Sequence, residues 1–210
     1  MKTETANEHY FSSKPSSRHT ERMISCTLRG RDYGFITDAS TFSKAKVDTG
    51  TVLLIKYMKI EPSDTVLDLG CGYGPIGIVA ASLAGKGKCY MVDINERSAE
   101  LAERNAKLNH AINAVVKSGN MFEPLADIIF DVILTNPPIS AGRKTVFSFI
   151  EQSHSHLGNG GRFYLVARTR QGAKTIKEKM NAVFGNSECV SIHSGYRVLM
   201  SKKIGSRINE

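Results

Sequence analysis

Three polar side chains stand where they could recognise a nucleoside and an amine. Asp68 lies two residues before the first of three alternating glycines, Asp93 ends a later apolar run, and Asn136 ends another apolar run just before two prolines. A carboxylate can accept hydrogen bonds from both hydroxyls of a ribose. An amide oxygen can accept the N–H groups of an exocyclic amine. These residue types indicate a nucleotide-like ligand next to an amine.

The glycines at 70, 72 and 74 lie between a strand-like apolar run and a helical apolar pattern. Because glycine has no Cβ, the chain can turn sharply there and bring the N–H groups of the helix start close to a polar ligand. A tight strand-to-helix turn also uses glycine for steric reasons, so the triplet alone is a weak signal. Asp93 strengthens it, since a βαβ nucleotide site places its ribose acid at the end of the next strand. A plain strand-end acid is the alternative.

Asn136 is followed by Pro137 and Pro138. The two prolines fix φ and lack backbone donors, so the turn should hold the Asn136 side chain stiffly. A stiff amide suits a planar amine, whose two N–H groups the amide oxygen and a proline carbonyl could accept. The alternative is an ordinary turn that ends a strand.

Together these features resemble the class I S-adenosylmethionine-dependent methyltransferases. The spacing Asp-x-Gly-x-Gly-x-Gly fits that family better than the dehydrogenase fingerprint Gly-x-Gly-x-x-Gly, and an Asn-Pro-Pro turn is not a dehydrogenase feature. The resemblance implies S-adenosyl-L-methionine as the cofactor. The cofactor-binding residues that we predict are Asp68, Gly70, Cys71, Gly72, Gly74, Asp93, Ile94, Asn120, Met121 and Asn136.

The resemblance also implies a catalytic role for Asn136, Pro137 and Pro138, which would orient the amine toward the methyl group of the cofactor. Methyl transfer from a sulfonium is an in-line displacement with a good leaving group, so positioning can supply most of the catalysis. Many amine-directed members have an aromatic residue after the prolines, where this chain has an isoleucine. The predicted substrate contacts are Ile139, Arg143 and Lys144. The two cations suit an RNA phosphate, or else form a solvated first helical turn.

Further motifs narrow the resemblance to the small-domain methyltransferases related to the bacterial 16S rRNA guanine-N2 methyltransferases of the C type. The motifs are His9 to Pro15, Phe42 to Thr51, Asn136 to Lys144, Gln171 to Ala173, Phe184 to Asn186 and Gly195 to Leu199. The resemblance implies methyl transfer to the N2 amine of a guanine in ribosomal RNA. The best-known bacterial members carry an additional N-terminal domain that has no counterpart here, so the target nucleotide is left open.

The resemblance implies a Rossmann-like α/β class I methyltransferase fold, with a seven-stranded, mostly parallel sheet whose last strand is antiparallel. We expect an N-terminal extension with a β-hairpin at 1–45, the methyltransferase domain at 46–203 and a basic tail at 204–210. Apolar spacing predicts a helix over 52–60, another that runs through Ser153 to Leu157, and a strand over 160–167.

Two N-terminal segments carry charge or helix-start signals. Lys14, Arg18, Arg22, Arg29 and Arg31 outnumber the acids of the extension and could form a phosphate-facing edge, or the hairpin is a solvated edge guarded by charge. Asp48, Thr49 and Thr51 are residues typical of a helix start, and they predict an N-cap for the helix that follows. In the family that the chain resembles, the segment 42–51 borders the methionine end of the cofactor.

The composition is that of one α/β domain: 210 residues, 41% hydrophobic and 23% charged. No apolar run approaches the roughly 20 residues of a membrane span, and the N-terminus lacks an apolar signal region, so we expect a cytoplasmic protein. The four cysteines form no Cys-x-x-Cys pair, which argues against a metal site and a disulfide framework. The net charge of +8 favours a polyanionic partner such as RNA, here small-subunit rRNA or its particle.

Two other functions fit parts of the sequence. A methyltransferase that acts on a protein amide or a small-molecule amine would use the same Asn-Pro-Pro turn, because that turn does not distinguish which kind of molecule carries the amine. A non-catalytic RNA-binding factor could keep the fold, but both the glycine loop and Asn136 are intact, which disfavours it. The sequence does not indicate an oligomeric state.

Overall fold

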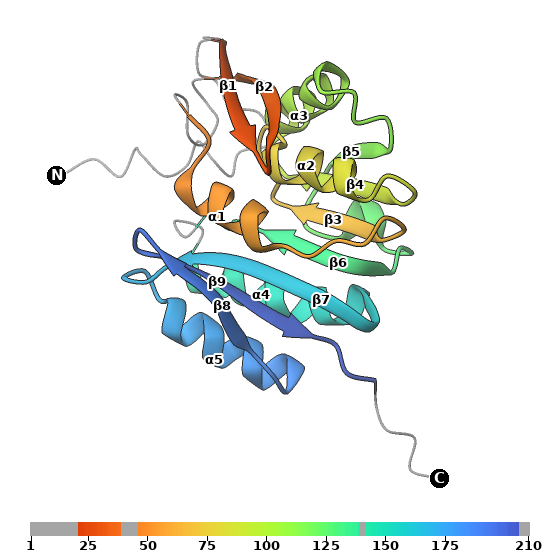
Figure 1. Cartoon of the computed structure of the whole chain (residues 1–210). Helices are drawn as coiled ribbons and strands as arrows, with labels where there is room; N and C mark the ends of the chain where they lie inside the picture. Colours follow the sequence, from red (N-terminus) through yellow and green to blue (C-terminus); the bar gives the residue numbers. More distant parts are fainter. Residues whose placement is uncertain (1–20, 39–45, 139–141, 206–210) are drawn as a thin grey trace, which may run out of the picture.

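The computed structural model describes residues 21–38, 46–138 and 142–205, which form a seven-stranded sheet and a separate two-stranded hairpin (Figure 1). The order of the strands in the sheet is β5-β4-β3-β6-β7-β9-β8. Their bounds are β3 (Thr65–Leu69), β4 (Lys88–Asp93), β5 (Ala114–Ser118), β6 (Phe130–Thr135), β7 (Leu157–Arg168), β8 (Glu188–His193) and β9 (Tyr196–Lys202).

The strands from β5 to β7 are parallel, and β9 runs antiparallel to both of its neighbours, β7 and β8. The prediction of a seven-stranded, mostly parallel sheet with an antiparallel last strand is therefore confirmed. The chain moves outward from β3 to β5 and then returns to place β6 on the other side of β3. In open α/β sheets such a reversal opens a crevice beyond the carboxyl ends of the strands, which is where ligands bind.

Helices cover both faces of the sheet. One face packs against α1 (Thr49–Tyr57), α2 (Pro75–Leu83) and α3 (Glu96–Leu108). The other packs against α4 (Gly142–His156), α5 (Ala173–Phe184) and the short 3₁₀ helix η1 (Glu123–Leu125). Because both faces are covered, the central strands read as continuous apolar runs. No helix in the described part of the chain is long and apolar enough to cross a membrane.

Two predicted helix ends are wrong. The first helix ends at Tyr57 and not at residue 60, because Met58 is extended, with φ −60° and ψ 134°. The helix that we extended to Leu157 ends at His156, and β7 starts at Leu157 instead of residue 160. Leu157 is buried and pairs with Phe130, and the register then shifts before Val132. A leucine fits either periodicity, so only the strand pairing decides its state.

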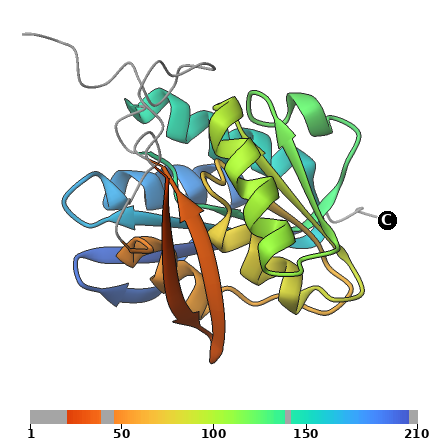
Figure 2. The same ribbon diagram turned by 90° about the horizontal axis from the view of Figure 1, so that it is seen from above.

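The predicted N-terminal hairpin is present as β1 (Arg22–Leu28) and β2 (Arg31–Thr37), which pair antiparallel. Figure 2 shows the hairpin alongside α3 and outside the main sheet. Asn105 of α3 accepts a hydrogen bond from Ile36 N at 2.7 Å and donates to Ile36 O at 2.9 Å. One turn later, Asn109 makes the same pair of bonds with Gly34, at 3.1 and 2.8 Å. The two asparagines thus pair with β2 as a neighbouring strand would.

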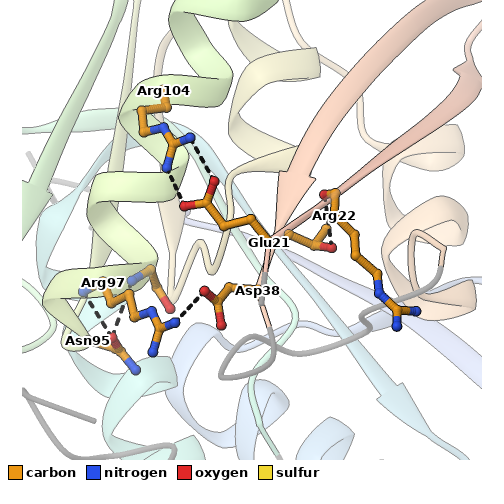
Figure 3. Close-up of polar contacts among 8 residues, drawn as sticks. Glu21, Arg22, Asp38, Asn95, Arg97 and Arg104 are labelled. Atoms are coloured by element: carbon orange, nitrogen blue, oxygen red, sulfur yellow. Dashed lines mark hydrogen bonds and ion pairs between the residues drawn. The ribbon is translucent and has the colours of Figure 1, made fainter. Parts of the chain in front are cut away.

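Ion pairs also fix the hairpin to α3. Arg104 binds the Glu21 carboxylate through both terminal nitrogens, and Arg97 pairs with Asp38, where both residues are buried (Figure 3). Arg29, which we had assigned to a phosphate-facing edge, donates to two carbonyl oxygens at the end of α1. Its guanidinium therefore binds the end of a helix. Arg29 is exposed, and its contact with a phosphate stays a prediction. Lys14 and Arg18 lie outside the described residues.

Candidate functional site

The glycine loop connects β3 to α2 and has the left-handed backbone that its glycines allow. The φ angles of Gly70, Gly72 and Gly74 are 75°, 56° and 93°. Residues with a Cβ would be strained in this region. The amides of Gly70 and Cys71 both donate to Val92 O, at 2.8 and 3.0 Å, which holds the loop against the end of β4. The loop is thus fixed by the backbone of the next strand.

Asp93 stands at the end of β4 and is 4% exposed. Its Oδ2 accepts a hydrogen bond from Gly72 N at 2.8 Å, and its Oδ1 accepts one from Asn95 N at 2.9 Å. Burial raises the pKa of this carboxyl group, and the two backbone N–H donors oppose that rise. Each carboxylate oxygen has a second lone pair. Asp93 can therefore hold the glycine loop and still accept ligand hydroxyls.

Asp68 contacts α2 from within the core. It is fully buried, its Oδ2 accepts a hydrogen bond from Gly77 N at 2.8 Å, and its Oδ1 has no hydrogen-bond partner among the described residues. Burial raises its pKa to about 7, the negative charge of Asp93 acts in the same direction, and the Gly77 N–H opposes both. Asp68 does not line the pocket beside the loop. Its direct cofactor contact stays a prediction.

A pocket opens at the carboxyl ends of β3 and β4, beside the glycine loop. It brings together five of the predicted cofactor residues, which are Gly70, Asp93, Ile94, Asn120 and Met121. The first of the two prolines after Asn136 is buried, and the second, Pro138, lines the same pocket. Cys71, Gly72, Gly74 and Asn136 are not among the lining residues. Cys71 is buried with its thiol toward Gly72 O, and burial raises its pKa well above the usual range.

Several pocket residues were not named from the sequence. Leu69, Val92 and Gly119 come from the strand ends that flank the predicted residues, and Thr145 and Phe149 come from α4. Their spacing of four places both α4 residues on one helix face, and that spacing was visible in the sequence. Asn95 caps α3 through its Oδ1, while its buried Nδ2 has no partner among the described residues. Asn95 lies two residues after Asp93 and is not among the residues that line the pocket.

Asn136 is held by the start of α1. Its Nδ2 donates to Thr51 Oγ1 at 2.9 Å and to Asp48 Oδ2 at 3.2 Å. Asp48, one of the three residues predicted to start this helix, is the N-cap of α1, and its Oδ2 also accepts from the amides of Gly50 and Thr51. Within the described part of the chain, Asn136 Oδ1 accepts no hydrogen bond. The half-buried amide therefore has its nitrogen engaged and its oxygen available.

The predicted substrate residues are only partly placed. Arg143 and Lys144 are exposed on the first turn of α4, and neither lines the pocket of Gly70 and Asp93. Arg143 instead lines a separate cleft between α4 and α5, together with Arg170 and other residues. Ile139 lies outside the described residues. A role of these side chains in substrate binding stays a prediction.

No metal-binding cluster of three His, Cys, Asp or Glu side chains is present among the residues that the structure describes. The histidines of α4 contact aromatic rings. His154 meets Phe184 edge-on with ring centroids 5.0 Å apart, and His156 stacks on Phe122 at 4.2 Å. Both contacts are packing interactions.

The comparisons with known proteins agree on one family. The model of the methyltransferase small domain family matches residues 32–200. An uncharacterized protein of Bacillus subtilis, YbxB, is 38% identical over 200 residues, which cover 94% of this chain and 100% of that protein. The ribosomal RNA small subunit methyltransferase C of Haemophilus influenzae (strain 86-028NP) is 34% identical over 165 residues, which cover 77% of this chain and 48% of that protein.

Solved structures show the same fold. The 16S rRNA N2 methyltransferase of T. thermophilus, in complex with AdoMet and guanosine, has a TM-score of 0.79 at 24% identity, and the match covers 90% of this chain and 52% of that one. A methyltransferase of Pyrococcus furiosus has a TM-score of 0.65 at 21% identity, covering 78% of this chain and 87% of that one. The chain thus spans about half the length of the rRNA methyltransferases described here.

Proposed function

The chain belongs to the methyltransferase small domain family, and from that premise we propose that it is an S-adenosylmethionine-dependent methyltransferase that acts in the cytoplasm on the N2 amine of a guanine in ribosomal RNA. The observation that carries the proposal is the state of Asn136. Its amide nitrogen is bound to Asp48 and Thr51, so its oxygen is the atom that can accept an N–H group.

The pocket residues fit the cofactor. Leu69, Val92, Ile94, Met121 and Phe149 give apolar walls that suit the faces of a purine ring. Asp93 at the pocket edge supplies acceptors for the ribose hydroxyls, and the glycine loop lets backbone approach the ligand without side chains in between. When bound, S-adenosylmethionine supplies an electrophilic methyl group on a positively charged sulfur.

The protein's contribution to the transfer is orientation. Asn136 Oδ1 would accept an N–H of the target amine and turn the nitrogen lone pair toward the methyl carbon. The nitrogen forms the new N–C bond while the S–C bond breaks, the electron pair of that bond stays on sulfur, and the extra proton leaves the nitrogen for water. Alignment of this kind is worth up to about 7–11 kcal/mol in intramolecular models. Because the leaving group is neutral and stable, no base has to be assigned.

Charge and relatives support RNA as the acceptor. The chain carries a net charge of +8. Four cations are exposed at the start of α4 and at the carboxyl end of β7, namely Arg143, Lys144, Arg168 and Arg170. Such cations can hold the phosphates around a target base. The relatives point to the same class, because one is a small-subunit rRNA methyltransferase and the T. thermophilus structure contains guanosine.

A transfer assay tests the proposal. Labelled S-adenosylmethionine is incubated with naked small-subunit rRNA and with assembled small subunits, and the nucleosides are then analysed. We expect label in N2-methylguanosine with the native protein and none with Asn136→Ala. Asn136→Ala should still bind the cofactor, whereas Asp93→Ala should bind it at least about tenfold more weakly, because it loses charged acceptors.

Two results would contradict this assignment. If neither RNA sample takes up label while the native protein binds the cofactor, ribosomal RNA is not the acceptor, and protein amides and small-molecule amines are assayed next. If both variants lose cofactor binding equally, the separate roles of Asp93 and Asn136 are wrong.

A further inference from the structure

We propose that Asp48 and Tyr196 are positioning residues that fix which end of the Asn136 amide faces the acceptor. This inference rests on the proposed function, in which Asn136 receives an amine. Asp48 lies at the start of α1 and Tyr196 at the start of β9. Asp48 contacts Asn136, and Tyr196 contacts Asp48, at the carboxyl edge of the sheet.

The argument starts from the symmetry of an amide. The oxygen and the NH₂ group of an asparagine are nearly equal in size, so only hydrogen bonding decides which of them points where. Thr51 Oγ1 lies 2.9 Å from Asn136 Nδ2, but a hydroxyl both donates and accepts, so it fits either orientation. Asp48 Oδ2, at 3.2 Å, is a carboxylate oxygen and can only accept. Asp48 is therefore the contact that keeps the amide nitrogen of Asn136 toward α1. The amide oxygen is then left to bind the amine that receives the methyl group.

The Asp48 carboxylate is itself fixed from two sides. Its Oδ2 accepts hydrogen bonds from Gly50 N at 2.8 Å and Thr51 N at 3.2 Å. Its Oδ1 accepts one from the Tyr196 hydroxyl at 3.1 Å. Burial raises the pKa of Tyr196, and the charge of Asp48 acts in the same direction, so the hydroxyl keeps its proton at neutral pH and donates. The carboxylate can rotate only by breaking one of these bonds.

The ring of Tyr196 is held in place as well. Tyr196 is 8% exposed and packs directly on the first turn of α1, where a Cβ on Gly50 would lie 2.7 Å from its Cε1. The guanidinium carbon of Arg168, at the end of β7, lies 5.0 Å from the centroid of this ring. The aromatic ring and the Asp48 carboxylate, 2.9 Å from such a Cβ, thus leave room only for a glycine at position 50. The tyrosine ring thus occupies a site that exists only because α1 and β9 lie close together.

The orientation of the amide decides which substrate atoms the site can bind. With the amide oxygen presented, Asn136 attracts groups that donate an N–H and repels carbonyl oxygens and unprotonated ring nitrogens, which are themselves acceptors. In a purine such as guanine, this preference selects the exocyclic amine over the hydrogen-bond acceptors of the same base. If the amide turned over, that preference would reverse.

The test uses substitutions that keep the helix cap. Asp48→Ser retains an N-cap oxygen for α1 but is too short to reach Asn136 and Tyr196. We expect kcat to fall by about tenfold to a hundredfold, since small misplacements have effects of this size, with the cofactor Kd changed less than about twofold. Asp48→Asn can place an oxygen in the position of Oδ2 and should restore kcat to within about fivefold of the native value.

Tyr196→Phe removes one hydroxyl and should lower kcat by a smaller factor, about threefold to tenfold. If the tyrosine acts through Asp48, adding Tyr196→Phe to Asp48→Ser lowers kcat no further, because residues in one network are not additive. Independent, multiplied losses would overturn the shared role.

A matched control is Asp64→Ser. Asp64 also accepts a backbone N–H, from Glu61, and binds Arg162, but it lies before the amino end of β3. This variant loses comparable contacts and should leave kcat unchanged. A fall in kcat equal to that of Asp48→Ser would show that both act only through stability.

A spectroscopic readout needs no acceptor. The side-chain NH₂ signals of Asn136, assigned by their absence in Asn136→Ala, should move in Asp48→Ser and stay in place in Asp64→Ser. Unmoved signals in Asp48→Ser would overturn the positioning role. If the native protein transfers no methyl group to RNA, the proposed function fails, while these signals still decide whether Asp48 holds the amide.

Discussion

Two buried carboxylates hold the glycine loop at opposite ends, yet they differ in what they can still do. Asp93 binds the loop through Gly72 N, uses both oxygens and lines the pocket. Asp68 binds α2 through Gly77 N, with its other oxygen enclosed by the core. The same residue type thus lines a pocket in one place and packs against a helix in the other. Both are buried, and they differ in whether the side chain lines the pocket.

Asp68 predicts a pH dependence of stability. Burial raises the pKa of its carboxyl group in the folded protein from 3.8 to about 7. Between these values the unfolded chain releases the proton first, so the contribution of Asp68 to stability is full below about pH 4 and is lost as the pH rises to about 7. Asp68→Asn cannot titrate. Its free energy of unfolding relative to the native protein should therefore rise by about 1.4 kcal/mol per pH unit within this range.

Urea unfolding at several pH values measures this difference. Other groups titrate alike in both proteins and cancel when the two curves are subtracted. A difference that stays constant from pH 4 to pH 7 would mean that Asp68 has an ordinary pKa in the folded protein.

Among the elements, α3 serves as the neighbouring strand for β2. Asn105 and Asn109 each bond to both the N–H and the C=O of one residue of β2, and the residues they bind, Ile36 and Gly34, are two apart. One helical turn spans about 5.4–6 Å, close to the rise of two strand residues. Helix and strand periods therefore match over this distance. The hairpin needs no third strand on this edge.

Hydrogen exchange tests this pairing residue by residue. Asn105→Ala removes the acceptor of Ile36 N–H and should speed exchange of that amide by about tenfold or more. Asn109→Ala should do the same for Gly34 N–H. Each variant is the control for the other, because its effect on the other amide should be smaller. Equal acceleration of both amides in both variants would mean that the hairpin opens only as a unit.

The sequence predicted most elements from local patterns, and its errors have a common cause. Strand cores, the Asn95 cap and the Asp48 cap follow from residue types within a few positions. The junction at Leu157 depends on a strand partner 27 positions earlier, Phe130, and the pairing of Asn105 with β2 spans 69 positions. No local period carries that information. The helix face of Asn105 was visible, but its partner was not.

At the scale of the whole molecule, the predicted functional residues lie at one edge of the sheet. The glycine loop, Asp93 and Asn136 all follow the carboxyl ends of parallel strands, so the sequence could place them together. The contacts of Asp48 with Asn136 and Tyr196 could not be predicted, because they join positions 88 and 148 residues apart. The proposed cofactor end of the site was therefore more predictable than the proposed acceptor end.

Basic residues at that same edge predict salt-dependent RNA binding. If Arg143 and Lys144 contact phosphates, replacing both by alanine should lower the slope of log K against log salt concentration by about 1 to 2 and weaken binding of different RNA sequences alike. The control variant replaces Lys86 and Lys88, which are exposed beside the amino end of β4. It has the same change in net charge. Equal slopes for the two double variants would mean that only net charge matters.

The contact between Tyr196 and Asp48 joins positions that leave the ribosome far apart in time. The glycine loop is tied by bonds that span 9 and 21 positions, whereas the tyrosine hydroxyl reaches back 148 positions. A growing chain contains Asp68, Asp93 and Asn136 long before β9 leaves the ribosome. Contacts between near neighbours in the chain form with less loop-closure entropy than distant ones. A nascent chain can thus form the bonds that hold the glycine loop before the Tyr196 hydroxyl of β9 reaches the Asp48 carboxylate.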